Sequence, residues 1–254
     1  MENNAEKNGT AKISLSKVRA TTEEKVIIPD AKLGIDKHLI TYYQPKGAIA
    51  EQYRTLRTNL KRINKENPVK VVLVTSSIHN EGKSTTSANL AVAMTYEKEK
   101  KILLIDADMR KGRIHELFGM LNLKGLSNYL ENEATADDII KKTPIAGLEV
   151  VTCGFIPTSP SELLGSRRMV DFLEKVREEY DFVIIDAPPV IPLTDAAVMG
   201  TSVDGVVIVA QAGRTKREVV KQTELLLAQA GCNVLGFILT NVEYYIPSYY
   251  YRYV

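Results

Sequence analysis

Short apolar runs alternate with amphipathic stretches through most of this chain, and the alternation predicts its fold. Runs that are apolar on every side are typical of strands buried on both faces of a sheet, and the amphipathic stretches between them predict helices. Strands that alternate with helices form a mostly parallel sheet covered by helices on both faces, so we expect an α/β fold. The expected strands are 69–75, 101–106, 148–152, 182–186, 205–210 and 234–240, and the expected helices are 84–98, 114–120, 161–179, 194–201 and 215–230.

The two ends of the chain do not follow this pattern. Residues 1–43 are polar and mixed in charge, which predicts a flexible N-terminal arm. A further helix is expected from about residue 45 to the break before Pro68. No repeat or linker divides residues 44–243, so we expect one domain over that range. The remaining residues, 244–254, form a tail that holds six of the chain's 12 tyrosines.

Charge and cysteine content narrow the class of protein. The 254 residues contain 33 Lys plus Arg and 31 Asp plus Glu, a balance that does not favour a nucleic-acid protein. No apolar run approaches the length of a membrane span, and the N-terminus lacks the apolar segment of a signal peptide. The two cysteines, Cys153 and Cys232, form no CxxC pair, and His38 and His115 are isolated, so we expect a cytoplasmic protein without structural zinc.

The first expected strand leads into a phosphate-binding pattern. Residues 77–84 read Ser-Ile-His-Asn-Glu-Gly-Lys-Ser, which is the P-loop pattern except that Ser77 replaces its first glycine. Backbone N–H groups at such a strand-to-helix turn point inward, and the helix N-terminus favours negative charge. A simple glycine turn with an exposed lysine is the alternative. The candidate nucleotide-binding residues are Asn80, Glu81, Gly82, Lys83, Ser84 and Thr85.

Carboxylates follow two other expected strands. Asp106 and Asp108 come at the end of one strand, and Asp186 ends another. The carboxyl ends of parallel strands meet at the edge where α/β sheets bind ligands. Each aspartate alone is more often a helix cap or a turn residue, but together with the P-loop they favour a Mg²⁺–nucleotide site. Asn241, just after the last strand, is a candidate adenine contact because its amide both donates and accepts hydrogen bonds.

Taken together, these motifs resemble those of the bacterial protein-tyrosine kinases that accompany capsule and exopolysaccharide synthesis, relatives of the MinD/ParA P-loop ATPases. The resemblance covers about residues 46–254. Besides the P-loop and the tyrosine-rich tail, it rests on LLIDADMR (103–110), GFIPTSPSELLGS (154–166), FVIIDAPP (182–189) and the Glu-x₂-Arg-x₂-Arg pattern of Glu51, Arg54 and Arg57.

The resemblance implies roles for these residues. Lys83 would hold the phosphates of ATP, while Ser84, Asp108 and Asp186 would hold Mg²⁺, and Asp106 would accept or orient the proton of a tyrosine hydroxyl. Glu51, Arg54 and Arg57 would join copies of the chain in a ring-like homo-oligomer. A separate membrane-embedded activator would recruit the kinase to the inner face of the cell membrane. The phosphate acceptors would be Tyr244, Tyr245, Tyr249, Tyr250, Tyr251 and Tyr253.

Other interpretations of the same features stay open. The tail could be an aromatic flap that packs on the domain, and the Glu51–Arg57 face could be an ordinary solvated helix face. A MinD/ParA-like ATPase switch would share the nucleotide site. Ile78 stands where those ATPases carry an extra lysine, and no basic amphipathic helix ends the chain, so both features argue against the switch. A nucleotide-gated scaffold of the polysaccharide machinery is the third candidate.

Overall fold

Seven strands form one sheet in the computed structural model, which describes residues 34–63, 68–97 and 99–242. Their order is β3-β4-β2-β5-β1-β6-β7, and every neighbouring pair is parallel except β3 with β4. The strands are β1 (Val71–Ser76), β2 (Ile102–Asp106), β3 (Ile140–Lys142), β4 (Leu148–Val151), β5 (Phe182–Asp186), β6 (Gly205–Gln211) and β7 (Val234–Thr240).

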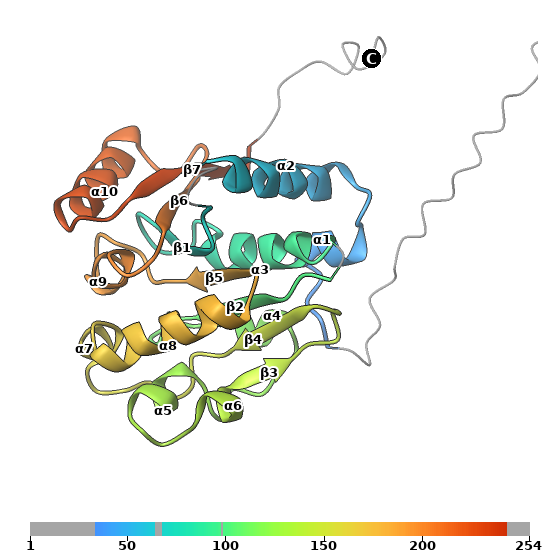
Figure 1. Ribbon diagram of the computed structural model, residues 1–254. Coiled ribbons are helices and arrows are strands. Elements are labelled where there is room, and N and C mark those ends of the chain that lie inside the picture. Colours follow the sequence, from blue (N-terminus) through green and yellow to red (C-terminus); the bar gives the residue numbers. More distant parts are fainter. Residues whose placement is uncertain (1–33, 64–67, 98, 243–254) are drawn as a thin grey trace, which may run out of the picture.

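Helices cover both faces of the sheet, because its strands send alternate side chains into two apolar cores (Figure 1). On β1, Val71 and Leu73 point into the core beneath α5–α10, and Val72 and Val74 into the core beneath α1–α4. The described helices are α1 (Ile40–Tyr43), α2 (Ala48–Arg62), α3 (Lys83–Met94), α4 (Ile114–Leu117), α5 (Leu126–Leu130), α6 (Ala136–Ile139), α7 (Pro160–Leu164), α8 (Arg167–Glu179), α9 (Asp195–Gly200) and α10 (Arg217–Gln229).

The α/β fold and all six expected strands are confirmed. The expected helix 161–179 is two helices, because Gly165 follows α7 and the Ser166 hydroxyl caps α8 by accepting a hydrogen bond from the Met169 N–H at 3.3 Å. The short elements α5, α6 and β3 were not expected. The three residues of β3, Ile-Lys-Lys, are too few and too polar to form a recognisable strand pattern.

The last strand is not buried on both faces, although its sequence is as apolar as the others. β7 lies at an edge of the sheet, and Phe237 and Leu239 are 47% and 63% exposed. An edge strand has a neighbour on one side only, and sequence composition does not report this. The expectation of a strand at 234–240 is therefore confirmed, whereas its complete burial is wrong.

Part of the expected N-terminal arm belongs to the packed domain. Residues 1–33 lie outside the described residues, but Ile35, Leu39 and Tyr43 are buried in the α3 side of the core. The Thr41 N–H donates a hydrogen bond to Asn89 Oδ1 of α3 at 3.0 Å. The arm boundary expected at residue 43 is thus too far along the chain, because the pattern Ile35-x₃-Leu39-x₃-Tyr43 places three apolar side chains on one surface.

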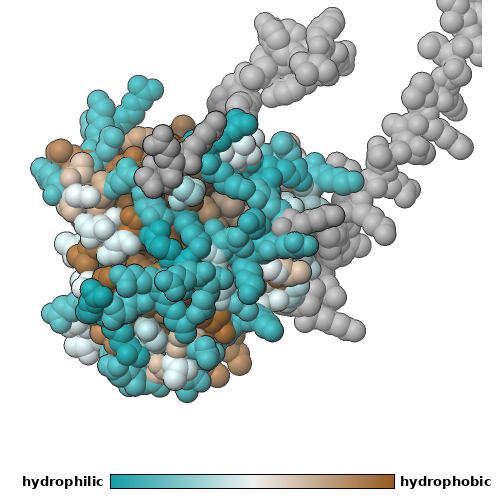
Figure 2. Space-filling model, in the orientation of Figure 1, coloured by the Kyte–Doolittle hydropathy of each residue, from teal (hydrophilic) through white to brown (hydrophobic). Residues whose placement is uncertain are grey.

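The outer surface is mostly hydrophilic in the orientation of Figure 2, where hydrophobic residues form scattered patches. Among the described helices, none is both long enough and apolar enough to cross a membrane. The tail residues 244–254, with their six tyrosines, lie outside the described residues.

Candidate active site

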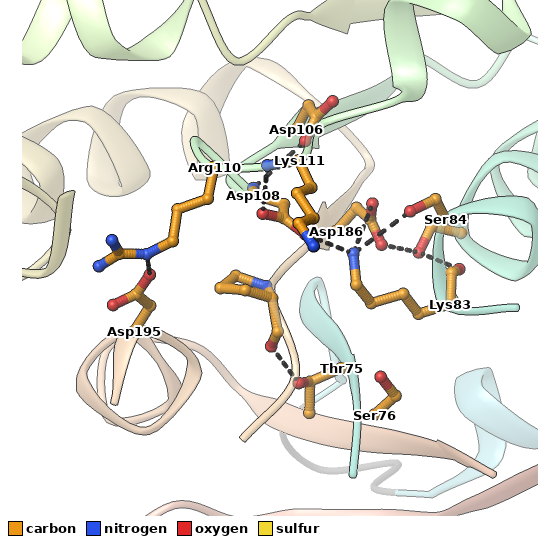
Figure 3. Close-up of polar contacts among 12 residues, drawn as sticks. Thr75, Ser76, Lys83, Ser84, Asp106, Asp108, Arg110, Lys111, Asp186 and Asp195 are labelled. Atoms are coloured by element: carbon orange, nitrogen blue, oxygen red, sulfur yellow. Dashed lines mark hydrogen bonds and ion pairs between the residues drawn. The ribbon is translucent and has the colours of Figure 1, made fainter. Parts of the chain in front are cut away.

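The carboxyl ends of three neighbouring strands, β2, β5 and β1, carry the candidate site (Figure 3). In the parallel register Asp106 of β2 pairs with Asp186 of β5, and Asp186 pairs with Val74 of β1. The P-loop leaves β1 directly beyond this point. The topology thus brings together groups that are up to about a hundred residues apart in sequence, as expected for the ligand-binding edge of an α/β sheet.

The P-loop has a left-handed backbone at two positions. Asn80 and Gly82 have φ values of 63° and 89°, and Gly82 immediately precedes α3. A Cβ at Gly82 would lie 3.3 Å from Cγ2 of Thr240 on β7, so a side chain there would be both strained and crowded. Glycine therefore permits the tight turn from the loop into α3, whose N-terminus is suited to binding an anion.

Glu81 holds the P-loop in shape and is itself only 1% exposed. Its Oε2 accepts a hydrogen bond from the Ile78 N–H at 2.8 Å, and its Oε1 accepts one from the Thr215 hydroxyl. The Thr240 hydroxyl donates to the Glu81 carbonyl at 2.7 Å, and Arg214 donates to the Asn80 carbonyl at 2.7 Å. The β6–α10 connection and the end of β7 thus brace the loop from outside.

Lys83 lies between two of the carboxylates. Its Nζ is 2.9 Å from Asp108 Oδ2 and 3.5 Å from Asp186 Oδ2, and all three side chains are at least nine-tenths buried. Desolvation alone would lower the pKa of Lys83, but the charges of Asp186 and Asp108 outweigh it and raise that pKa. The ammonium group is therefore charged and available for phosphate oxygens.

The donor set around Lys83 fits a divalent cation. The Ser84 hydroxyl lies 3.3 Å from Lys83 Nζ. Oxygen atoms of Ser84, Asp108 and Asp186 therefore surround the Lys83 ammonium group. Asp186 is fully buried, and its Oδ2 accepts no hydrogen bond from any described residue. Burial raises the pKa of Asp186, opposed by Lys83 and by a hydrogen bond from Ser84. The charged neighbour of this oxygen is the Lys83 ammonium, and a divalent cation such as Mg²⁺, which prefers oxygen ligands, can take its place there.

Asp106 lies on the other side of this cluster and is completely buried. Its oxygens accept hydrogen bonds from the backbone N–H groups of Asp108 at 3.2 Å and Ile114 at 3.0 Å. Desolvation and the neighbouring charge of Asp186 raise the pKa of Asp106 well above its ordinary value. A carboxylate with a raised pKa is a stronger proton acceptor, which suits a general base.

A cavity of about 250 Å³ opens in front of these groups. It is lined by the P-loop, by Asp108 and Lys111 after β2, and by His38 of the segment before α1. The lining includes the P-loop lysine and the N-terminus of α3, which are suited to binding phosphate groups.

Comparisons with known proteins agree with this geometry. Residues 69–224 match the family model described as AAA domain. The tyrosine-protein kinase YwqD of Bacillus subtilis is 37% identical over 207 residues, which span 82% of this chain and 87% of that protein. The chain belongs to the family of bacterial tyrosine-protein kinases.

Solved structures support the same assignment. The chimerical protein CapA2B2 superposes with a TM-score of 0.78 at 36% identity, covering 88% of this chain and 100% of that one. The kinase domain of the Escherichia coli tyrosine kinase ETK gives a TM-score of 0.76 at 33% identity, covering 82% and 83%. The enzyme class is therefore protein-tyrosine kinase, and its P-loop fold is one that binds nucleotides.

The kinase's predicted site residues gather at this edge of the sheet, with two differences. Asn80, Gly82, Lys83, Ser84, Thr85 and Asp108 line the cavity, with Asp186 and Asp106 behind them. The Glu81 side chain instead turns away to brace the loop, so its carboxylate is not a direct ligand in this structure. Asn241 lies in a separate groove between α2 and β7, together with Thr86 and Thr240.

A second polar cluster of the kinase was missed from the sequence. Arg110 Nε donates to Asp195 Oδ2 at 3.3 Å, and the Ser161 hydroxyl donates to Asp195 Oδ1. The three residues come from the ends of different strands and helices, and Asp195 is 1% exposed. The sequence pointed to this cluster only through the motifs LLIDADMR and GFIPTSPSELLGS, which contain Arg110 and Ser161.

The Glu51–Arg57 face of α2 is engaged within the protomer of the kinase. Arg54 donates hydrogen bonds to Glu51 and to the Pro45 carbonyl, and its guanidinium lies 5.7 Å from the ring centre of Tyr96. Arg57 donates to the Ala93 carbonyl near the C-terminus of α3 at 2.8 Å. These contacts orient both arginines and stabilise the packing of α2 on α3.

Proposed function

We propose that this kinase transfers the γ-phosphoryl group of ATP to the tyrosines of its own tail, residues 244–254. The observation that carries the proposal is the convergence of Lys83, Asp106, Asp108 and Asp186 in front of the P-loop. Phosphoryl transfer consists mainly of positioning and charge neutralisation, so a lysine, carboxylates and a cation are sufficient.

Lys83 has the central role in binding. Without nucleotide its ammonium pairs with Asp108 and Asp186. When phosphates enter, Nζ exchanges these carboxylates for phosphate oxygens, which leaves Ser84, Asp108 and Asp186 free to hold Mg²⁺. Bound Mg²⁺ would neutralise charge on the phosphate oxygens. Asn80, Gly82 and Thr85 contribute backbone N–H groups, and Asn241 approaches the adenine from the neighbouring groove.

Asp106 accepts the proton of the incoming tyrosine hydroxyl as the oxygen attacks phosphorus. Its two backbone hydrogen bonds hold the carboxyl group in place, and its raised pKa increases its basicity. The acceptor oxygen thus gains nucleophilic character only when it lies in line with the γ-phosphate.

We infer that the tail is the acceptor because β7, the strand that precedes it in the chain, ends at the same edge of the sheet as the site. β7 ends at Thr240, whose hydroxyl contacts the P-loop, and the first tail tyrosine comes four residues later. Eleven extended residues reach ~36–40 Å, so the tail of one copy can enter the site of a neighbour. This reach is compatible with transfer in trans within a homo-oligomer, whose proposed interface is the Glu-x₂-Arg-x₂-Arg pattern of Glu51, Arg54 and Arg57.

The biological setting completes the proposal. A separate membrane-embedded activator holds the kinase at the inner face of the cell membrane, and the phosphorylation state regulates capsule or exopolysaccharide synthesis and export. The chain is similar to the chimerical protein CapA2B2, and this similarity supports the pairing of the kinase with a second protein. Six phosphotyrosines would add about −9 to −12 charges, enough to loosen an assembly of tails.

Intact-mass spectrometry after incubation with Mg-ATP tests the proposal. The wild type should gain several phosphates that map to 244–253, whereas Lys83→Ala should gain none. Lys100→Ala, which removes an exposed lysine paired with Asp181, should be labelled like the wild type. A cytoplasmic fragment of the activator is added if the protein alone is silent. ADP release without phosphate on the chain, even with activator, would contradict the proposal and favour an ATPase switch.

A further inference from the structure

Asp106 also belongs to a second group of side chains whose atoms could bind a metal ion, together with His115 and Cys153. Asp106 ends β2, His115 lies on α4 and Cys153 follows β4, and one ligand atom from each lies within 4.8 Å of the others. Asp106 and Cys153 are buried, and His115 is partly exposed. No sequence motif indicates this cluster, because its members are up to 47 residues apart and each is isolated.

Two observations indicate that the cluster is open to a ligand. Nδ1 of His115 is buried and has no hydrogen-bond partner among the described residues. Residue 112 is a glycine, and a Cβ there would lie 2.6 Å from both Asp106 Oδ2 and Cys153 Sγ. Residue 112 therefore places no side chain beside the carboxylate and the thiol.

The donor set distinguishes between metals. One thiol, one imidazole and one carboxylate are ligands of Zn²⁺, whereas Mg²⁺ requires oxygen ligands in an octahedron. Tetrahedral Zn²⁺ bonds place ligand atoms about 3.3–3.8 Å apart, so side-chain shifts of about 1 Å close the present spacing. Three protein ligands leave the fourth position for water.

The surroundings of Cys153 disfavour its thiolate form in the absence of a metal. Burial, followed by the charge of Asp106, raises the pKa of Cys153 to about 12. A neutral buried thiol is a poor nucleophile and resists oxidation. A bound divalent cation favours the thiolate over the thiol, because a thiol that coordinates a metal is deprotonated.

We propose that Asp106, His115 and Cys153 form an inhibitory Zn²⁺ site of this kinase. Binding forms a Zn–S bond while the thiol proton leaves to solvent, and it occupies the Asp106 carboxylate. The inhibitory effect rests on the proposed role of Asp106 as the base for tyrosine, whereas the binding of Zn²⁺ does not. Mg²⁺ held by Ser84, Asp108 and Asp186 does not compete, because the two cations use different ligands.

Cobalt(II) is the probe that tests the site itself. The full-length protein titrated with Co²⁺ should develop intense tetrahedral visible bands and a thiolate-to-cobalt charge-transfer band, both removed by added Zn²⁺. Cys153→Ser should lose the charge-transfer band, and His115→Gln should bind Zn²⁺ at least about tenfold more weakly. Cys232→Ser is the matched control, because Cys232 is a buried thiol next to Ala197, away from this cluster, and it should behave like the wild type.

Kinase assays test the consequence separately. Zn²⁺ should inhibit tail phosphorylation in excess Mg-ATP, and the concentration for half-inhibition should rise at least about tenfold in Cys153→Ser. Cobalt spectra that are identical in Cys153→Ser and the wild type would overturn the site. Spectra as expected without inhibition would contradict the inhibitory role. A protein with cobalt bands but no kinase activity, even with the activator fragment, would instead contradict the proposed function.

Discussion

At the scale of single residues, Glu81 shows how a motif position can have a structural role. The P-loop pattern made it a candidate nucleotide contact, yet its carboxylate binds the Ile78 N–H and the Thr215 hydroxyl. The loop amides that face the cavity are therefore positioned by a side chain that points away from it. Buried hydrogen bonds to a charged group are among the stronger ones, which makes this brace energetically significant.

Removing the brace should weaken nucleotide binding without removing any contact to the nucleotide. We expect Glu81→Ala to lower nucleotide affinity about tenfold and to destabilise the protein by about 1–3 kcal/mol, since Ile78 loses its acceptor. Thr215→Val should have a smaller effect of the same kind, and the double variant should be less impaired than the sum. Calorimetric titration with ADP measures each affinity. Additive effects of the two substitutions would contradict the brace and favour direct contact by Glu81.

The clustering of the candidate site residues could be predicted from sequence more fully than the contacts around them. Asp106 and Asp186 end their strands, Asp108 lies two residues beyond β2, and Lys83 begins the helix after the P-loop. Parallel strands bring these ends together. Arg110 meets Asp195, and His115 meets Cys153, only because segments 85 and 38 residues apart in sequence fold against one another. No periodicity or local motif encodes such contacts, so they required the three-dimensional structure.

At the scale of elements, the segment that precedes α2 is the clearest departure from expectation. Its polar composition predicted an arm, but Leu39 is completely buried against the α3 side of the core. The Asn89 amide of α3 donates to the His38 carbonyl at 2.9 Å and fixes the segment next to the P-loop helix. Four helical residues are too few to give a helical pattern, which explains why α1 was not recognised.

If this segment is part of the domain, Leu39→Ala should be strongly destabilising. We expect a loss of about 2–5 kcal/mol in the free energy of unfolding, since a buried leucine leaves a cavity. Urea denaturation followed by circular dichroism measures the loss. Leu121→Ala is the control, because Leu121 is 74% exposed and should change stability by less than about 0.5 kcal/mol. Equal stability of the two variants would mean that residues 34–43 belong to the N-terminal arm and not to the packed domain.

The strands show which elements sequence predicts well. The central parallel strands are continuous apolar runs, because helices cover both of their faces, and all were found. The edge strands were harder: β3 has three residues, and β7 is apolar but partly exposed. Position within a sheet depends on topology, so an edge strand and a central strand of similar composition look alike in sequence.

At the scale of the whole molecule, the site places a stability cost on the nucleotide-free kinase. Asp106 and Asp186 are both fully buried, and desolvation raises the pKa of each above the ordinary value of 3.8. The folded protein therefore retains protons at a pH where the unfolded chain has released them. Stability must fall as the pH rises through this interval, and the loss continues until the folded-state pKa is passed. Binding of a cation and nucleotide would reduce this loss of stability from the buried carboxylates.

The difference in stability between Asp106→Asn and the wild type isolates this effect. Asparagine does not titrate, so the variant should gain stability relative to the wild type as the pH rises above 3.8, with a slope of up to about 1.4 kcal/mol per pH unit. Lost hydrogen bonds to Asp108 and Ile114 shift the difference by a constant and leave its slope unchanged. Carboxylates such as Asp181, whose pKa is lowered by a hydrogen bond from Lys100, act in the opposite direction but are common to both proteins. Urea denaturation of both proteins across a pH series, without nucleotide, measures the slope. A difference that does not change with pH would mean that Asp106 titrates normally, and it would remove the physical basis for its proposed role as a base of raised pKa.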